Sequence, residues 1–408
     1  MPTNYGANQY VNELYNIRAT IDGVELPGIT SLNFKHKVNS SRIATLTLQS
    51  REGLEMLRIG GEITINFGLS DAYANKMIAY EDGTLMGLLG SSVPNDFYGR
   101  IKIIKPSLST TTLTAMDLVS DLATSTMNNI RWKDYGSQDM YMVAKDICDY
   151  AGIDISSLDE STMYTETQGL RNSREKTGKL NSDFKIYGIQ TRKSFLDSLF
   201  ELMVFNPNDT APLNSSSAPK GAYMSDSLPF IQFYYAIRQG KRMDFFAPNR
   251  FDKRSKPVLK VGPDEANAVG DGLVGQIDSS NLINSVTIAS KDDETESITI
   301  EDQTSIHKHG TFAKNFTFNS SNKHTMREFA YTLIQKYKEP TKVYKIQLSG
   351  AEWVQLGDLV EVTSPILGTK ELFPVVEKEI SVSDEVVTKL VVGSRTVSTK
   401  KLLEMVQR

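Results

Sequence analysis

The sequence predicts a mainly β protein with an α+β middle, in which two similar small β-barrels flank a mixed α/β middle region. Three observations support this prediction: strand-like alternation toward both ends, helical periodicity in the middle, and a repeated glycine turn. The 408 residues predict two to four domains, because a domain holds roughly 100–200 residues. Hydrophobic residues make up 39% and charged residues 23%, a globular composition that excludes global disorder.

The first 125 residues predict strands and little helix. Thr45 and Thr47 alternate with Ala44, Leu46 and Leu48, as in a strand with one buried face. A set of six strands without much helix is typical of a small barrel or sandwich. The strands expected here are Tyr15–Ile21, Ile29–Lys37, Ser41–Gln49, Glu62–Phe67, Phe97–Lys105 and Thr110–Ala115.

The middle of the chain predicts helices and polar loops. Met140, Val143, Ala144 and Ile147 follow i, i+3, i+4, i+7 spacing, which predicts an amphipathic helix over Ser137–Tyr150. A second helix is expected over the apolar positions Phe195, Leu196, Leu199, Phe200 and Met203. The other expected segments are loops at Leu158–Lys185 and Asn206–Pro229, strands at Phe230–Ile237 and Met243–Ala247, and a glycine-containing linker at Gly262–Gly275.

Strands resume after Asn281, with one helix among them. The expected strands are Ile283–Lys291, Ser297–Ile300, Phe312–Asn319, Lys342–Leu348, Leu359–Thr363, Pro374–Ser383 and Val386–Val392. The helix is expected from the apolar face of Met326, Phe329, Ala330, Leu333, Ile334 and Tyr337. The predicted domains are a barrel at 1–125, a mixed middle domain at 126–275, a second barrel at 276–392 and a tail at 393–408.

An internal repeat relates the two β regions. Gly60–Ile65 aligns with Gly357–Val362, a glycine turn followed by matching apolar positions. Further matches, at an offset of 276, are Phe97 with Phe373, Ile104 with Ile380 and Thr112 with Thr388. Two unrelated β domains would also give glycine turns before alternating strands. If the repeat is a duplication, three copies would form six similar blocks around a ring that could meet a six-fold partner.

Composition excludes several classes of protein. The net charge is −4, so no overall basic field argues for nucleic acid or an anionic membrane, although Arg171–Lys260 holds 16 basic and 8 acidic residues. The single cysteine, Cys148, excludes an intrachain disulfide and a multi-cysteine zinc site. The polar N-terminus and the lack of a long apolar run predict neither a signal peptide nor a membrane span.

The sequence supports no catalytic, cofactor or metal site. Gly270–Gly275 matches G-x-G-x-x-G, but no buried strand precedes it and no helix follows, so a flexible linker is the better interpretation. His307 and His309 would share one face of a strand, yet two histidines are fewer ligands than zinc sites use. The usual local signatures of serine hydrolases, zincins and P-loop enzymes are absent. A pair of carboxylates for glycoside hydrolysis is not excluded by the sequence, because the separation of the two groups depends on the fold.

Four turn residues and two charge clusters are the candidate structural residues. Gly60, Gly61, Gly357 and Asp358 are expected to set the geometry of the two barrels, since glycine permits the sharp turns. The charge clusters are solvated faces or docking surfaces for neighbouring subunits. Their candidate interface residues are basic Arg250, Lys253 and Arg254 and acidic Asp292, Asp293 and Glu294.

Several short motifs follow one another along nearly the whole chain. They are I-G-G-E-I-T-I, D-F-Y-G-R-I, L-T-A-M-D-L, S-Q-D-M-Y-M-V-A-K-D-I, T-R-K-S-F-L-D-S-L-F, N-L-I-N-S-V-T-I-A-S, I-H-K-H-G, M-R-E-F-A-Y-T-L-I and W-V-Q-L-G-D-L-V-E-V. Their order resembles the baseplate hub proteins of long-tailed phages. That family includes the late-control protein D type and the hub part of type VI secretion spikes.

The resemblance implies a non-enzymatic homotrimer in which paired hub barrels form a pseudo-six-fold ring around a channel. Such a ring joins the hexameric tail tube to a central spike or tip, contacts baseplate wedge or other tail proteins, and lets DNA pass. The implied location is the virion tail baseplate, assembled in the host cytoplasm without membrane insertion. The chain ends at Arg408 without a β-helical extension, so a separate spike protein is expected. The alternatives are the hub of a phage-like contractile injection system and a tail-associated cell-wall hydrolase.

Overall fold

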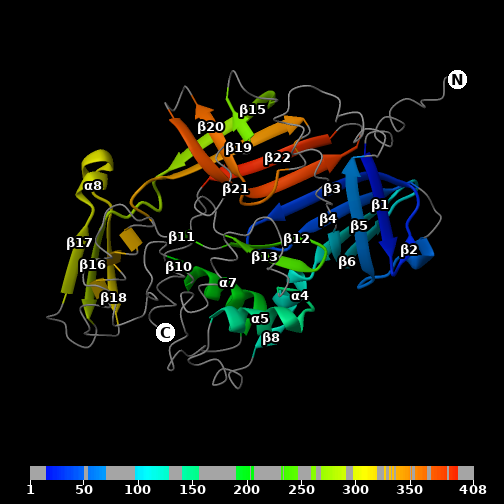
Figure 1. Ribbon diagram of the computed structural model, residues 1–408, viewed down its shortest axis with the longest axis horizontal. Coiled ribbons are helices and arrows are strands. Elements are labelled where there is room, and N and C mark those ends of the chain that lie inside the picture. The colour runs from blue at the N-terminus through cyan, green and yellow to red at the C-terminus, as the bar shows by residue number, and fades with distance from the viewer. Residues whose placement is uncertain are drawn as a thin grey trace.

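The computed structural model describes most of the predicted strands and helices (Figure 1). The described residues are 15–49, 54–69, 97–127, 140–155, 190–202, 204–205, 231–232, 234–246, 259–262, 268–290, 297–318, 326–327, 330–331, 333–334, 337–349, 351, 354–364, 369–383 and 386–393.

The N-terminal β region, residues 15–117, is an antiparallel sheet and is called the first half below. Its strands are β1 (Tyr15–Ile21), β2 (Val24–Glu25), β3 (Ile29–Lys37), β4 (Ile43–Leu48), β5 (Glu62–Leu69), β6 (Phe97–Pro106) and β7 (Thr111–Asp117), with a 3-10 turn, η1, at Leu54–Met56. Alternate side chains are buried along β4 and β7, as the sequence alternation predicts. The core includes Phe34, whose ring centre lies 5.9 Å from that of Phe97 and 6.4 Å from that of Phe67.

The C-terminal β region, between residues 259 and 393, is also built of strands and is called the second half below. They are β14 (Leu259–Val261), β15 (Ala268–Asp278), β19 (Thr341–Ser349), β20 (Leu359–Ser364), β21 (Thr369–Val382) and β22 (Val386–Gly393). The linker interpretation of Gly262–Gly275 is wrong from Ala268 onward, because β15 runs through these residues and pairs with β19 at Ala268 and from Leu273 on, while residues 263–267 lie outside the described residues. Glycines weaken a strand when it stands alone, but a non-local partner supplies the hydrogen bonds that hold this one extended.

The two halves have the same strand order. The first half is ordered β3-β4-β7-β6-β5-β1, and the second is ordered β15-β19-β22-β21-β20-β14. Each strand therefore has a counterpart at the same place in its half, in the same order along the chain. One pairing differs in direction, since β1 is antiparallel to β5 whereas β14 is parallel to β20. This topology supports a duplication and disfavours two unrelated β domains.

The ladders also fix the register of the repeat. The β6–β7 ladder is irregular just after Ile101, and the β21–β22 ladder is irregular just after Val375. Ile101 and Val375 are therefore equivalent, which gives an offset of 274 residues between the two repeats. Across those ladders Ala115 corresponds to Val392, an offset of 277 residues. The predicted offset of 276 is therefore wrong by two residues in one strand and by one in the next. Val375 and its partner Val392 are 17 positions apart, whereas Ile101 and Ala115 are 14 apart, so the β21–β22 hairpin holds three more residues between the matched positions, which explains the change.

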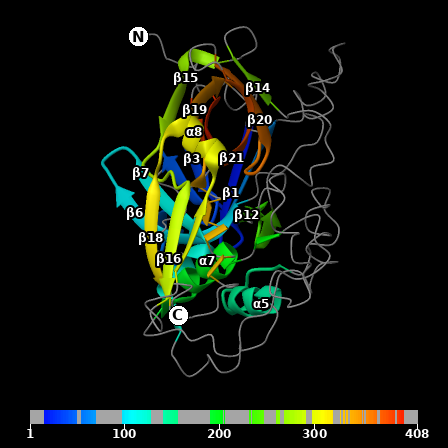
Figure 2. The same cartoon turned by 90° about the vertical axis from the view of Figure 1, so that its left-hand side faces the viewer.

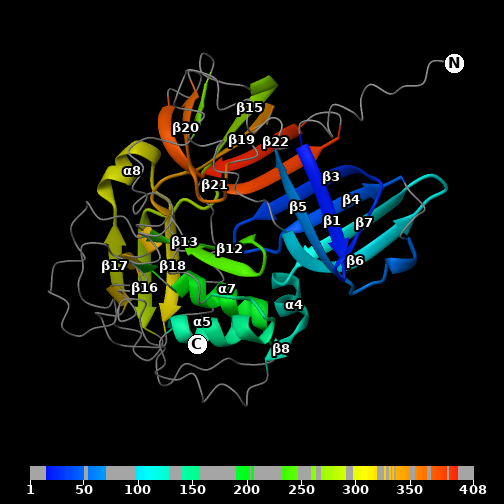
Figure 3. The same ribbon diagram turned by 45° about the vertical axis from the view of Figure 1, so that its right-hand side comes forward.

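The two halves join through β3 and β21. These strands pair antiparallel from Glu377 opposite Lys37 to Val382 opposite Leu32, a contact called the internal seam below. The seam, where β3 and β21 lie side by side (Figure 3), produces one 13-stranded sheet that runs between β15 and β2 (Figure 1). The mainly β class is confirmed, but two separate closed barrels are not resolved.

The middle region packs beneath the sheet and is mixed, as predicted. Its elements are α4 (Val119–Thr124), β8 (Thr126–Met127), α5 (Met140–Tyr150), β9 (Gln190–Thr191), α7 (Arg192–Leu202), β10 (Val204–Phe205), β11 (Ile231–Gln232), β12 (Tyr234–Gln239) and β13 (Arg242–Phe246). Asn39, in the β3–β4 turn, attaches this region to the sheet. Its backbone N–H donates to the Tyr235 carbonyl and its Oδ1 accepts from the Tyr235 N–H, each at 2.8 Å.

A small unit is inserted between β15 and β19. It consists of β16 (Ser285–Ser290), β17 (Ser297–Glu301), α8 (Gln303–His309), β18 (Ala313–Phe318) and helical residues between 326 and 337. One face of its three-stranded sheet packs on the helical residues through Val286, Ile288, Phe316, Ala330 and Leu333. Helix α8 lies at one end of β16 and β18 (Figure 2). Val38–Arg42 fills the corresponding place in the first half, so the inserted unit is specific to the second half.

Candidate assembly surfaces

The predicted glycine turns have closely similar geometry in the two halves. Gly60 has φ +84° and Gly357 has φ +86°, in the region that side chains rarely adopt. The Gly60 N–H donates to the Ile101 carbonyl and the Gly357 N–H to the Val375 carbonyl, both at 2.8 Å. The Ile101 N–H returns a bond to the carbonyl of Gly61 at 3.0 Å.

The second turn is closed by a side chain as well as by its backbone. Asp358, the counterpart of Gly61, is buried, and its Oδ2 accepts from the Gln355 N–H at 2.8 Å. Its carbonyl accepts from the Val375 N–H at 2.9 Å. The two turns therefore hold the starts of β5 and β20 against β6 and β21, at the residues where the ladders of β6 and β21 become irregular.

The six candidate interface charges lie outside the described residues. They are Arg250, Lys253, Arg254, Asp292, Asp293 and Glu294. Their docking role stays a prediction.

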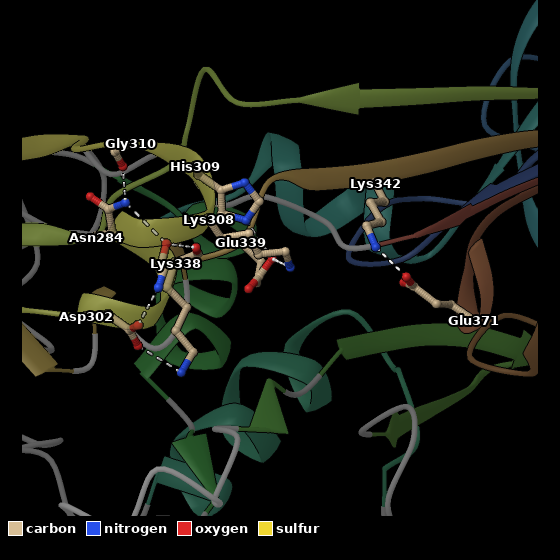
Figure 4. Close-up of polar contacts among 10 residues, drawn as sticks. Asn284, Asp302, Lys308, His309, Gly310, Lys338, Glu339, Lys342 and Glu371 are labelled. Atoms are coloured by element: carbon tan, nitrogen blue, oxygen red, sulfur yellow. Dashed lines mark hydrogen bonds and ion pairs between the residues drawn. The ribbon is translucent and has the colours of Figure 1, made fainter. Parts of the chain in front are cut away.

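The placement of His307 and His309 on a strand is wrong. Both lie on helix α8, which Asp302 caps by accepting the Ser305 N–H at 2.8 Å and which ends at Gly310 with φ +84°. His309 Nε2 and Lys308 Nζ each lie 3.1 Å from Glu339 Oε2 (Figure 4). Burial acts to raise the pKa of Glu339, but bonds from Lys308 and His309 outweigh it and leave the pKa below its ordinary value.

A buried network around Asn284 closes the inserted unit, and sequence reasoning missed it. Asn284 Nδ2 donates to Ser305 Oγ at 3.2 Å and to the Gly310 carbonyl at 2.7 Å (Figure 4). Its Oδ1 accepts the Phe312 N–H at 2.7 Å. Lys338 Nζ lies 3.2 Å from Asp302 Oδ2. Asn284 therefore joins the start of β16 to both ends of α8, and only the N-L-I-N motif pointed to this place.

The internal seam buries a histidine beside several cationic side chains. His36, Arg42 and Lys378 are buried together, and Arg238 approaches them from β12. Lys378 Nζ donates to the Val354 carbonyl, and the Arg42 guanidinium lies 4.4 Å from the centre of the Phe34 ring. His36 Nε2 has no hydrogen-bond partner among the residues that the structure describes. Burial lowers the pKa of His36 well below its ordinary value, and the three cations add to this shift.

The pH dependence of stability tests this seam. His36 in the unfolded chain takes up a proton near pH 6.5, whereas the folded protein keeps it neutral, so the free energy of unfolding falls as the pH drops below about 6.5. Between about pH 7.5 and about pH 5.5, the wild-type protein is expected to lose about 1 kcal/mol more than His36→Gln. Urea unfolding of both proteins at the two pH values measures this difference.

Two controls isolate His36 in that comparison. Burial raises the pKa of Asp117 to about 7, so the stability that Asp117 contributes is lost as the pH rises through about 7, the opposite direction. Both proteins keep Asp117, and subtraction removes its effect. His307→Gln, an exposed change on α8, is expected to leave the free energy of unfolding at about pH 7.5 unaltered. Parallel profiles for the wild type and His36→Gln would contradict the assignment.

Two strand edges carry exposed apolar side chains. On β6 and the turn that follows it, Ile103 is 41% exposed and Leu108 is 96% exposed. On β15, Val274 is 59% exposed and Ile277 is 47% exposed. In the described part of the chain, β5 pairs with β6 only over Phe97–Arg100, and β15 pairs only with β19. An unpaired strand edge of this kind has free backbone groups to which another strand could add.

The described residues offer little for catalysis. Cys148 is buried on α5, and burial raises the pKa of its thiol far above the usual value, which disfavours the reactive thiolate. Within the described ranges, no group of three or more His, Cys, Asp or Glu side chains is placed to hold a metal ion. None of the helices that the structure describes is both long and apolar enough to cross a membrane.

Three solved structures share this fold over nearly the whole chain. A 43 kDa tail protein of prophage MuSo2 from Shewanella oneidensis is 12% identical, with a TM-score of 0.58, and covers 92% of this chain and 97% of its own. A tail protein from Neisseria meningitidis is 12% identical, with a TM-score of 0.54 and coverages of 95% and 98%. Prophage tail protein gp18 from Listeria monocytogenes is 11% identical, with a TM-score of 0.52 and coverages of 96% and 98%. The chain therefore has the fold of prophage tail proteins.

The comparison of the sequence with protein families matches a smaller part of the chain. Residues 257–389, which span most of the second half, match the family described as YQBQ-like. No curated protein matches the sequence significantly.

Proposed function

We propose that this chain is a structural protein of a phage tail and forms the hub of its baseplate. The observation that carries this proposal is the fold, shared over more than 90% of the chain with three prophage tail proteins. The order of sequence motifs supports the same assignment independently. The predicted location is the tail baseplate of the virion, with assembly in the host cytoplasm.

The proposed form is a homotrimeric ring. Each copy holds two halves with the same strand order, so three copies present six similar blocks, which match a hexameric tail tube on one side. A central spike or tip protein is the proposed partner on the other side, with baseplate wedge or other tail proteins around the ring. The channel through the ring would carry the genome, and no membrane insertion is proposed.

The proposed role is non-enzymatic, and its important residues are structural. Gly60, Gly61, Gly357 and Asp358 would hold the shape of the two halves. Arg250, Lys253, Arg254, Asp292, Asp293 and Glu294 remain proposed docking charges. The domain ranges 1–125, 126–275, 276–392 and 393–408 also stay a prediction.

The mass of the purified protein in solution tests the ring. Light scattering after size exclusion is expected to give about three times 45.5 kDa, with rings in electron micrographs. If purified protein stays monomeric, co-expression with the tail proteins of adjacent genes is expected to restore the trimer, because hub interfaces can depend on a tube or spike. A monomer under both conditions would contradict the ring.

Location and activity test the hub role separately from the oligomer. Antibody labelling of virions is expected to mark the end of the tail that meets the host cell. Zymography with the purified protein is expected to leave peptidoglycan intact. Labelling of the capsid, or cleared peptidoglycan, would contradict the structural assignment.

A further inference from the structure

The internal seam provides a template for joining two halves of this fold. Its pairs include Glu377 with Lys37 and Glu379 with Lys35. The Val38 N–H donates to the Val376 carbonyl at 3.0 Å, just before the first pair. Because backbone groups alternate in direction along a strand, these two pairs are of the closer, non-hydrogen-bonded kind.

The repeat gives each seam strand a counterpart at an edge. By strand order, β15 corresponds to β3 and β6 corresponds to β21. In the register of the ladders, Ile103 of β6 is equivalent to Glu377 of β21, and Gly275 of β15 is equivalent to Phe34 of β3. In both halves the ladder has an irregularity at the corresponding position. The segment after it forms the seam in β21, and its counterpart in β6 could form a similar one.

The edges of β6 and β15 have no strand partner in the described part of the chain. They carry apolar side chains at the positions that match buried residues of the internal seam. Ile277 corresponds to His36, and Ile104 corresponds to Lys378, both of which are buried in the internal seam. At the edges the same facing positions hold two isoleucines, and Ile277 is largely exposed in the single chain. Apolar side chains gain from burial without the desolvation cost that His36 and Lys378 carry.

We propose that β6 of one copy pairs antiparallel with β15 of the next copy, in the register of the internal seam. The expected pairs are Ile103 with Asp278, Ile104 with Ile277, Lys105 with Gln276, Pro106 with Gly275 and Ser107 with Val274. The partner is a second copy of this chain, because its free edges are the counterparts of the two strands that already form the internal seam. The inference rests on the proposed ring, and it names the residues that would close that ring.

Charge and geometry agree with this pairing. In the internal seam, Glu377 lies 3.3 Å from Lys35 Nζ and 3.4 Å from Lys37 Nζ. On the outer face of the proposed pairing, Lys105 of one copy lies diagonal to Asp278 of the next, so opposite charges again meet across the strands. Pro106 has no N–H, so this ladder has one hydrogen bond fewer than the internal seam.

The pairing joins two different surfaces, one from each half, so it repeats from copy to copy. Such head-to-tail contacts form rings when the rotation between copies closes. They also remove the sheet edges that would otherwise recruit unrelated strands. Six similar seams, three internal and three between copies, would then make the trimer nearly six-fold.

A cysteine pair tests the register directly. Lys105→Cys and Gln276→Cys occupy exposed positions, and non-hydrogen-bonded neighbours have Cα atoms about 4.5 Å apart, within the range of a disulfide. The native Cys148 is buried and gives little background. After mild oxidation the double variant is expected to run as covalent trimers without reductant, and a mixture of the two single variants is expected to give dimers.

A matched pair controls for chance collisions. Ser107→Cys with Asp278→Cys uses the same two edges but sits four residues out of register, so it is expected to give no disulfide. Trimers by light scattering without a Lys105–Gln276 disulfide, or with a disulfide in the control pair, would overturn this pairing and leave the proposed ring intact. Monomers without a disulfide, alone and with the tail proteins, would overturn both the pairing and the ring.

Discussion

The substitution Gly60→Val is expected to lower the free energy of unfolding by about 2–3 kcal/mol, and Gly357→Val is expected to do the same in the second half. A Cβ atom at Gly60 would meet nothing within 4 Å, so the cost at this turn is conformational rather than steric. Valine is branched at Cβ and strongly disfavours the φ of +84° found there. The turn cannot relax without losing the bond from the Gly60 N–H to Ile101. Urea unfolding measures the loss.

Asparagine provides the matched control at both turns. It tolerates a positive φ better than other side chains, so Gly60→Asn and Gly357→Asn are expected to cost less than about 1 kcal/mol. The exposed change His307→Ala is expected to leave both stability and trimer formation unaltered, whereas Gly357→Val is expected to reduce the trimer fraction. If valine and asparagine are tolerated equally at Gly60, the turn is not a determinant of the fold.

Local patterns in the sequence predicted most of the strands. β1 and β3 run as predicted from Tyr15–Ile21 and Ile29–Lys37, because alternation along one strand is a short-range signal. The alignment of Gly60–Ile65 with Gly357–Val362 also agrees with the hydrogen bonds of the two turns. Glycine turns can be read from sequence because few residues accept their backbone geometry.

Long-range pairing is what the sequence could not show. β15 contains glycine at three positions and reads as a linker, and only its partner β19 makes it a strand. His307 and His309 alternate like strand residues, but the cap at Asp302 and the terminal Gly310 make that segment a helix. Periodicity over three residues cannot distinguish these alternatives.

The buried polar groups were missed for a related reason. Asn284 and His36 are single residues, and nothing in their neighbourhood marks them as buried. Their importance comes from residues distant in the chain, such as Gly310 for Asn284 and Lys378 for His36. The internal seam likewise joins residues 340 to 350 positions apart. The proposed counterpart at the edges of β6 and β15 depends on the register of the two halves, which their ladders define and no local sequence pattern contains.

The substitution Asn284→Ala is expected to have the largest effect, a loss of about 3–5 kcal/mol in the stability of the inserted unit. The change removes three hydrogen bonds at once and leaves the buried Ser305 Oγ, the half-buried Phe312 N–H and the carbonyl of the more exposed Gly310 without that partner. Each such group costs about 1–3 kcal/mol when its partner is removed. Hydrogen exchange is expected to accelerate at the amides of β16, which the network holds against α8.

The effect is expected to be confined to the inserted unit. The β19–β22 ladder is formed by other strands and packs in a different core, so its amides should keep their protection. Asn315→Ala is the matched control, because Asn315 is an exposed asparagine on β18 of the same small sheet and its loss should cost less than about 0.5 kcal/mol. Unchanged exchange in β16 after Asn284→Ala would show that the core formed by Val286, Ile288 and Phe316 holds the unit without the network. Equal acceleration in β22 would show instead that the inserted unit and the large sheet unfold together.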